Sequence, residues 1–117
     1  MKEIKNQPII NPYVYAGLFK ADYNLRSERY LLDLVSKHFG VSKEEIMGTS
    51  RVRYRVVPRH ALCKLLREYT PLGLKDIGKF MGGRDHSTII HAISATNDSL
   101  DTDKIFKRKY KELLEKI

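Results

Sequence analysis

The stretch Met81-Gly82-Gly83-Arg84-Asp85-His86-Ser87-Thr88-Ile89-Ile90-His91 holds the most specific signal in the chain. Two consecutive glycines interrupt one helical pattern, and a cluster of hydrogen-bonding side chains opens the next. Because glycine reaches positive φ without a steric penalty, Gly82-Gly83 predicts a tight turn. Asp85 is a favourable N-cap for the helix that follows. The stretch therefore predicts a helix-turn-helix whose second helix begins with polar side chains.

The segments on either side of this turn show helical spacing. Upstream, residues 74–81 predict a short helix, and Gly78 within it is unfavourable by about 1 kcal/mol relative to alanine. A residue that unfavourable indicates that another helix packs closely there. Downstream, we expect a polar break at 97–102, with Asp101 or Thr102 as the next N-cap, and a last helix from about Asp103. The apolar residues expected to face inward on these two helices are Ile89, Ile90, Ile93, Thr96, Leu100, Ile105, Phe106, Tyr110, Leu113, Leu114 and Ile117.

The first half of the chain contains start and stop signals for two more helices. Ser27 is a favourable N-cap for a helix that ends near Gly40, a residue suited to a left-handed C-cap. Ser42 and Glu45 have the spacing of a capping box, which predicts a short helix ending at Met47-Gly48.

A basic segment and a further helix follow. Between Thr49 and Val57 arginine alternates with apolar residues, but no partner strand exists in the chain, so we expect a basic loop. Pro58 suits the first turn of a helix with an apolar face that ends before Pro71. Cys63 lies beside this face and is expected to be a small buried side chain. The fold class predicted from these patterns is all-α, with about six helices.

The first 24 residues have a different character from the rest. Pro8 and Pro12 disfavour a helix, and four aromatic residues lie close together at Tyr13, Tyr15, Phe19 and Tyr23. We expect residues 1–24 to form an N-terminal arm that packs on its own domain or on a protein partner, and residues 25–117 to form one domain.

The charge of the chain favours an anionic partner. It has 22 Lys and Arg residues against 14 Asp and Glu residues, for a net charge of +8. Residues 51–67 contain six basic residues and no acidic one. This run indicates either phosphate contact or a solvated basic loop.

Several kinds of site are excluded by what the sequence lacks. Its single cysteine rules out an internal disulfide and a cysteine-based zinc site, and no phosphate-binding glycine loop is present, so we expect no cofactor, no nucleotide and no metal. His86 and His91 are five residues apart, about 140° around a helix, which is poor geometry for holding a metal. Adjacent residues point apart on a helix, so Asp85-His86-Ser87 is not a catalytic triad. We expect no enzyme activity. The chain also lacks a secretion signal and an apolar run of membrane-spanning length, so we expect a cytoplasmic protein without a membrane partner.

The same polar residues suit recognition of duplex DNA. The N-terminal residues of a recognition helix reach base edges in the major groove, and Asp85, His86 and Ser87 carry suitable donors and acceptors. Thr88 and His91 would lie near the phosphate backbone. A simpler alternative is that Asp85 only caps the helix and His86 is a solvated surface residue. Arginines 51, 53 and 55 on the expected loop suit a narrow minor groove or phosphate contact.

A family resemblance is carried by residues 82–92, Gly-Gly-Arg-Asp-His-Ser-Thr-Ile-Ile-His-Ala. This segment resembles the signature of the C-terminal DNA-binding domain of the DnaA family of bacterial replication initiators. Pro58-Arg59-His60, residues 65–70 and Leu74-x-x-Ile77-Gly78 extend it. It covers residues 26–115 as a pattern, with the specific motif at 51–92. The resemblance implies a six-helix Trp-repressor-like domain that binds short double-stranded DNA sites, DnaA boxes, at replication origins.

The resemblance also implies which residues contact DNA. The expected base contacts are Asp85, His86 and Ser87 in the major groove and Arg51 in the minor groove. The expected phosphate contacts are Arg53, Arg55, Arg59, His60, Arg67, Thr70, Thr88 and His91. Of these, Arg55 is expected from the basic segment alone and not from the resemblance. His60 stands where the family usually has Gln, Ser87 replaces a common Thr, and Thr49 and Ser50 occupy positions that are often basic.

The function expected from these residues is sequence-specific DNA binding in origin recognition or its regulation, on the bacterial nucleoid. The chain is either part of a full initiator or a free-standing regulator. The alternative is an interaction adaptor that keeps the fold without base readout.

Overall fold

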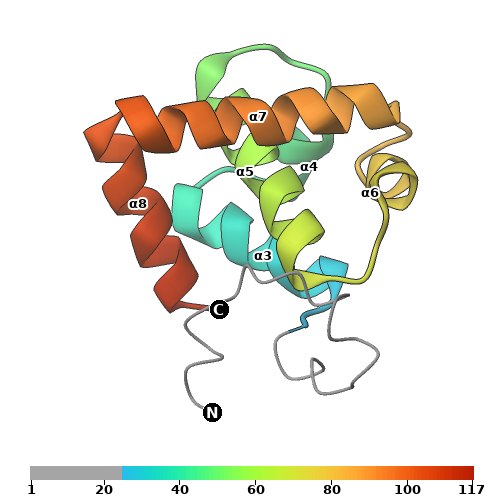
Figure 1. Cartoon of the computed structure of the whole chain (residues 1–117), viewed down its shortest axis with the longest axis horizontal. Helices are drawn as coiled ribbons and strands as arrows, with labels where there is room; N and C mark the ends of the chain where they lie inside the picture. Colours follow the sequence, from blue (N-terminus) through green and yellow to red (C-terminus); the bar gives the residue numbers. More distant parts are fainter. Residues whose placement is uncertain (1–24) are drawn as a thin grey trace.

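The computed structural model describes residues 25–117, and in this range the chain is all-α (Figure 1). The predicted arm, residues 1–24, lies outside the described residues. The described part forms six helices and no strand, which confirms the predicted fold class. The helices are α3 (Glu28–Phe39), α4 (Lys43–Met47), α5 (Arg53–Tyr69), α6 (Leu74–Phe80), α7 (His86–Thr102) and α8 (Lys104–Glu115). None of these helices is long and apolar enough to cross a membrane.

The caps predicted for the first two helices are confirmed. The Ser27 side chain accepts a hydrogen bond from the backbone N–H of Tyr30, and Gly40 ends α3 in the left-handed region at φ 68°. Ser42 and Glu45 form both hydrogen bonds of the capping box. These local signals predict the helix ends correctly because each capping hydrogen bond is made within a few residues of the chain.

The helix α5 begins earlier than predicted. The expected basic loop at 49–57 is a loop only as far as Val52, and the helix starts at Arg53, so Pro58 lies inside it. Proline disfavours the helical conformation of the residue before it, which is why the sequence pointed to a later start. Contacts with α4 hold the first turn, since the Tyr54 hydroxyl donates to Glu45 at 3.0 Å and Arg55 pairs with the same carboxylate at 3.0 Å.

The predicted polar break at 97–102 is also wrong, because α7 continues as far as Thr102. The N-cap of α8 is Asp103, rather than Asp101 or Thr102, and its carboxylate accepts from the backbone N–H groups of Ile105 and Phe106. Polar residues can fill this last part of α7 because most of them face solvent, so polarity did not mark a helix end.

Two residues predicted to face inward lie on the surface instead. Ile90 is 47 % exposed and Ile105 is 73 % exposed. Ile89 and Phe106, their direct neighbours in the sequence, are buried and occupy the inward positions. Where two apolar residues are adjacent on a helix, spacing alone does not decide which one faces the core.

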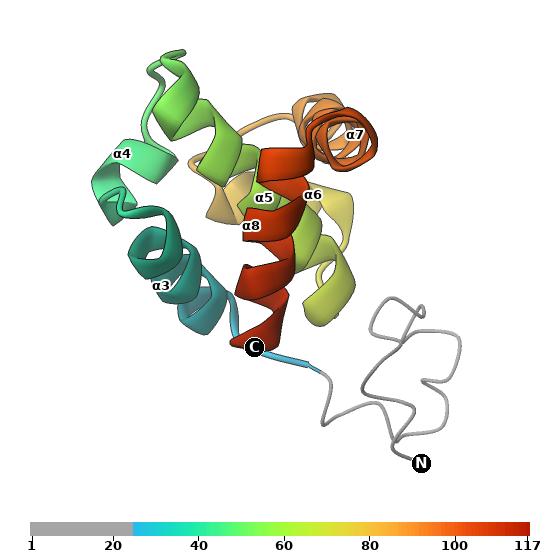
Figure 2. The same ribbon diagram turned by 90° about the vertical axis from the view of Figure 1, so that its left-hand side faces the viewer.

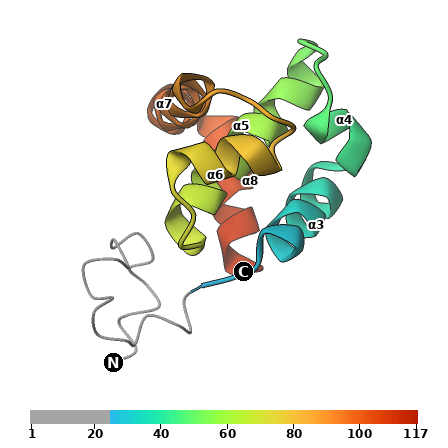
Figure 3. The same cartoon turned by 90° about the vertical axis from the view of Figure 1, so that its right-hand side faces the viewer.

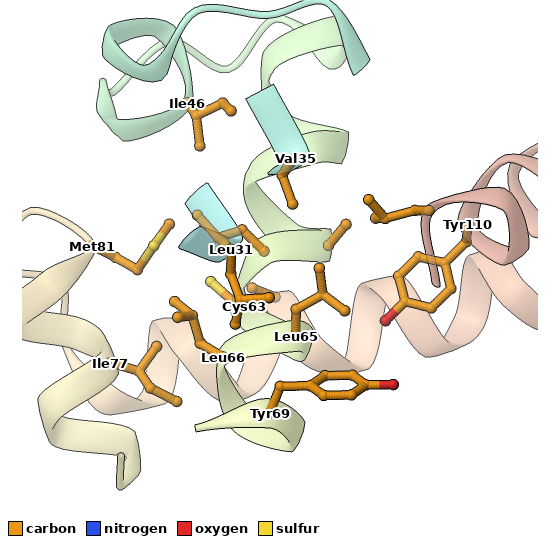
Figure 4. Packing of buried hydrophobic residues seen from close by; sticks show 14 of the residues in the cluster. Leu31, Val35, Ile46, Cys63, Leu65, Leu66, Tyr69, Ile77, Met81 and Tyr110 are labelled. Carbon is orange, nitrogen blue, oxygen red and sulfur yellow. The ribbon is translucent and has the colours of Figure 1, made fainter. Parts of the chain in front are cut away.

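The core is built around α5, onto which α3, α4, α6 and α7 pack, while α8 packs mainly against α7 and α3 (Figure 4). Leu62, Leu65 and Leu66 of this helix are fully buried, and side chains of α3, α6, α7 and α8 surround them. Cys63 is 1 % exposed, and burial raises the pKa of its thiol to about 12. This confirms the prediction that the cysteine is a small buried side chain.

Helices α6 and α7 form the predicted helix-turn-helix; in Figure 3, α6 lies across the view and α7 is seen nearly end-on. Gly82 and Gly83 have φ values of 88° and 81° in the turn. The backbone N–H groups of Gly83 and Arg84 both donate to the carbonyl of Gly78, at 3.0 and 2.8 Å. A Cβ atom on residue 78 would lie 2.1 Å from the Arg84 carbonyl oxygen. The predicted close packing at Gly78 is therefore real, but its partner is the backbone of the turn and not another helix.

We expect Gly78→Ala to destabilise the domain by about 1–3 kcal/mol or more, because the added methyl group has to displace backbone. The intrinsic gain of alanine in a helix, about 1 kcal/mol, only partly offsets this cost. Chemical denaturation followed by circular dichroism measures the change. Gly73→Ala is the control, because a Cβ there meets nothing within 4 Å and the only cost is that of alanine at the N-cap of α6. Equal stability of Gly78→Ala and the parent would contradict the close approach.

Candidate nucleic-acid interface

The N-terminal end of α7 presents polar side chains to solvent. Asp85, His86, Ser87, Thr88 and His91 are all exposed. The turn at residues 81–85 aims the start of this helix away from the core, while Ile89 anchors its other face. The residues predicted to contact DNA from this helix are therefore accessible together.

Asp85 is the N-cap of α7, as predicted. Its carboxylate accepts hydrogen bonds from the backbone N–H of Ser87, at 3.1 Å, and from the Ser87 hydroxyl. These bonds lower the pKa of the Asp85 carboxyl, the hydroxyl contributing most. Asp85 is thus an anion at neutral pH. Because a carboxylate has about four acceptor sites, it is able to cap the helix and accept from a ligand at once.

A second exposed element is the loop between α4 and α5, residues 48–52. Arg51 is exposed on it, next to Val52, which is 52 % exposed. In Figure 2, α7 is viewed nearly end-on, and the loop and the first turns of α5 rise on the other side of the upper face. Arg51 of the loop and Thr88 of α7 both line one depression, which lies between the two elements.

That depression is an open cleft of about 590 Å³. It brings together residues of the loop, of α5 and of α7 that are far apart in the sequence. No acidic residue lines it. Its lining residues are Thr49, Arg51, Val56, Arg59, His60, Cys63, Arg84, Thr88, Ile89 and Ala92. The cleft is therefore positively charged and suited to an anion.

A smaller hollow of about 290 Å³ continues the cleft along α7. Arg51 and His60 line both, and Arg53 joins them in the second. The hollow reaches Ser99 in the later turns of α7, and its lining also lacks a carboxylate. The two depressions form one cationic groove.

His60 is half-buried between the two depressions. Burial lowers the pKa of its imidazole, and the nearby cations Arg59 and Arg84 lower it further. His60 is therefore neutral near pH 7, with one ring nitrogen available as donor and the other as acceptor.

Arg59, which is predicted to contact phosphate, lines the cleft but is mostly buried. Its side chain is only 7 % exposed and donates to three backbone carbonyls, those of Ile46 at 2.6 Å, Ser50 at 2.8 Å and Glu45 at 3.0 Å. These bonds occupy all three guanidinium nitrogens. Arg59 holds the end of α4 in place, and we leave it out of the residues proposed to contact phosphate.

Thr70 is also inside the domain. It is fully buried, its hydroxyl donates to the Leu66 carbonyl at 2.6 Å, and it accepts from the backbone N–H of Leu72 at 3.1 Å. Its side chain ends α5 and starts the following turn. We leave Thr70 out of the proposed contact set on the same ground.

The remaining predicted phosphate ligands differ in position. Arg53 is exposed and has a loose ion pair with Asp103 at 3.8 Å. Arg55 is held against Glu45 and donates to the Tyr54 hydroxyl, away from the groove. Arg67 is exposed in the last turn of α5 and lines neither depression.

Arg84 is the site residue that the sequence did not single out. Its guanidinium donates to the carbonyls of Met47, Gly48 and Met81, so it joins the turn of the helix-turn-helix to the loop that carries Arg51. The sequence signal was its place between the Gly-Gly turn and the Asp85 cap. Nothing in its spacing showed a partner 36 residues away.

The described residues contain no group of three or more His, Cys, Asp or Glu side chains able to hold a metal ion. His86 lies beside Asp85, with 3.7 Å between its Nδ1 atom and the carboxylate. Both side chains are exposed and lie apart from the core in which Ile89 is buried. The arrangement is suited to binding an extended anion.

Comparison with known proteins agrees with this geometry. The family described as "Bacterial dnaA protein helix-turn-helix" matches residues 29–95. Similar curated proteins are named chromosomal replication initiator protein DnaA. The one from Chloroflexus aggregans is 33 % identical over 119 residues, covering 98 % of this chain and 25 % of the relative. That from Lachnoclostridium phytofermentans is 38 % identical over 87 residues, covering 74 % and 19 %. That from Thermus thermophilus is 39 % identical over 70 residues, covering 60 % and 16 %.

The chain thus spans about a quarter of the length of the first of these relatives. The family match covers α3 to α6 and more than half of α7, and so includes the loop, the cationic cleft and the turn. On this match and this architecture, the chain belongs to the bacterial DnaA helix-turn-helix family.

Proposed function

We propose that this domain binds duplex DNA in a sequence-specific manner, with α7 in the major groove and Arg51 in the minor groove. The observation that carries the proposal is the groove without carboxylates between these two exposed elements. In duplex DNA a sugar–phosphate backbone lies between the major groove and the minor groove. A protein that contacts bases in both grooves must therefore accommodate this backbone between its two base-contacting elements. The cationic cleft provides that space.

The roles of the residues follow from their positions. Asp85, His86 and Ser87 face base edges, where a carboxylate accepts from a cytosine amino group and an imidazole or hydroxyl donates or accepts. The proposed phosphate contacts are Arg53, Arg55, His60, Arg67, Thr88 and His91. Of these, His60 and Thr88 line the cleft itself. Arg55 and Arg67 lie outside it and require DNA to extend beyond it.

The family relatives are named as replication initiators, which supports a role in recognising DnaA-box-like sites at a replication origin or in regulating such sites. The position of the chain in the cell would then be the nucleoid. The proposed activity is binding alone, without catalysis, cofactor or nucleotide.

A second candidate is an interaction adaptor that keeps the fold without base readout. The observation that favours it is an exposed apolar area at Ile105 and Tyr54, which are 73 % and 53 % exposed and line a common shallow depression. The two candidates differ in whether DNA binding depends on sequence.

We expect the protein to select a consensus duplex from a random pool and to bind it more tightly than a scrambled duplex. Mobility-shift titrations at low and moderate salt measure both affinities. Affinity for either duplex should fall with salt because phosphate neutralisation releases counterions, while the preference for the selected duplex persists. Equal weak binding that vanishes for both at moderate salt would favour the adaptor.

Replacement of the base-reading residues should lower affinity and relax specificity. Arg51→Ala and His86→Ala should each cost about 1–3 kcal/mol on the selected duplex and much less on the scrambled one. Arg67→Ala, a proposed phosphate contact, should weaken binding to both duplexes equally. A loss of the same size on both duplexes for Arg51→Ala would make Arg51 a backbone contact.

Binding should also take up a proton at His60. The free imidazole has a lowered pKa, and a phosphate in the cleft stabilises the imidazolium and raises that pKa. A group whose pKa rises on binding makes affinity increase as pH falls from slightly alkaline to slightly acidic values. His60→Gln removes this contribution, so the difference between the two pH profiles isolates it from His86 and His91. Parallel profiles would place no phosphate at His60.

A further inference from the structure

Two arginines satisfy the carbonyl groups at the end of α4. The last carbonyls of any helix lack partners within the helix. Here Arg59, from α5, donates to Glu45 and Ile46 at 3.0 and 2.6 Å. Arg84, from the turn before α7, donates to Met47 at 3.4 Å. The three successive carbonyls are thus bound by side chains from two other parts of the fold.

The same two side chains also hold the loop that carries Arg51. Arg59 donates to the Ser50 carbonyl at 2.8 Å, and Arg84 donates to the carbonyl of Gly48. Both contacts lie within three residues of Arg51. The backbone leading to this exposed arginine is therefore fixed, although its side chain is free to point into solvent.

The backbone of Arg84 is fixed to the start of α7. It immediately precedes Asp85, the N-cap, and its backbone N–H donates to the Gly78 carbonyl at 2.8 Å. Its guanidinium also donates to the Met81 carbonyl in the turn. A single side chain thus connects the proposed minor-groove reader to the proposed major-groove reader across the cleft.

Only arginine has the shape for this connection. The guanidinium is planar, carries five N–H donors in a fixed fork and stays charged, whereas lysine offers one compact ammonium group. Arg84 reaches carbonyls on two separate segments, the Met47-Gly48 pair and Met81. A lysine would keep the positive charge in the cleft but would not bridge both segments with fixed geometry.

We propose that Arg84 is a positioning residue for DNA readout, which sets where Arg51 stands relative to the N-terminal end of α7. This inference rests on the proposed function. Groups that recognise one ligand together have to be held to within about 0.5 Å of their productive arrangement. Bases contacted in the minor groove and bases contacted in the major groove form one binding site only if Arg51 and the N-terminal end of α7 keep a constant relative position. Arg84 fixes that relative position, without touching a base.

The test uses chemistry that differs between the two grooves. In the minor groove a G·C pair adds the guanine amino group that an A·T pair lacks, and an inosine·C pair lacks it too. The duplex selected by the parent protein is therefore compared with versions in which the A·T pairs under Arg51 become G·C or inosine·C. The parent should bind the inosine·C version on the order of fivefold or more tightly than the G·C version.

In Arg84→Met and in Arg84→Lys, we expect this preference to shrink to within about twofold, while preferences in the part read by α7 persist. Arg51→Ala should abolish the preference in the parent and add no further loss of affinity to Arg84→Met, because both changes remove one interaction. Arg108→Met, in the exposed part of α8, is the matched control and should behave as the parent. Circular dichroism melts show that each variant is folded at the assay temperature, and Arg84→Lys carries the comparison if Arg84→Met is unfolded.

Two results would overturn the inference. One is a loss of equal factor on all duplexes in the Arg84 variants, with the minor-groove preference kept, which would make Arg84 a contributor of charge or stability only. The other is that Arg51→Ala lowers affinity by the same factor in the Arg84→Met variant as in the parent protein. Failure of the proposed function is distinguishable, because the parent itself would then show no preference for the selected duplex before any Arg84 variant is compared.

Discussion

The capping of α4 by Arg59 and Arg84 is the interaction on which the rest of the interface depends. A buried polar group that loses its partner costs about 1–3 kcal/mol. Five carbonyls between Glu45 and Ser50 accept hydrogen bonds from these two side chains. Burial lowers the pKa of the Arg59 guanidinium there, and the nearby charge of Arg84 lowers it further. Backbone dipoles, and not carboxylates, compensate the two charges. The cleft above therefore keeps its positive field, which a salt bridge would have cancelled.

The turn of the helix-turn-helix depends on the same region. Gly78 lets the Arg84 backbone approach α6 more closely than any side chain would permit, and Gly82 and Gly83 take the positive φ values that reverse the chain. As a result Arg84 points back to the α4 end while Asp85, the next residue, caps α7. A residue that stabilises the fold and a residue proposed to contact bases are thus adjacent in the chain, one turned inward and one turned outward.

Much of the fold could be predicted because its signals are local. Ser27, Gly40 and the Ser42–Glu45 pair mark helix ends through bonds made within five residues. The start of α5 could not be predicted in this way, because Tyr54 and Arg55 become helical through contacts with Glu45 of another helix. The prediction that Ile90 and Ile105 face the core was wrong because an apolar neighbour occupies the inward position at each site. In the candidate site, Arg51 and the polar residues that open α7 were predicted from the sequence as DNA contacts and are exposed, whereas the burial of Arg59 and Thr70 follows only from packing.

By itself, the sequence determined the all-α class, the turn at Gly82-Gly83, the Asp85 cap and the family signature, since each of these is written in neighbouring residues. The tertiary structure alone decided which arginines face solvent and which serve the fold. Arg51, Arg59 and Arg84 have the same charge and chemistry in the sequence. They differ because backbone carbonyls, including those of Ile46 and Met47, 13 and 37 residues away, bind two of them and leave the third exposed. The physical reason is that hydrogen-bond partners distant in the chain are brought together only by folding.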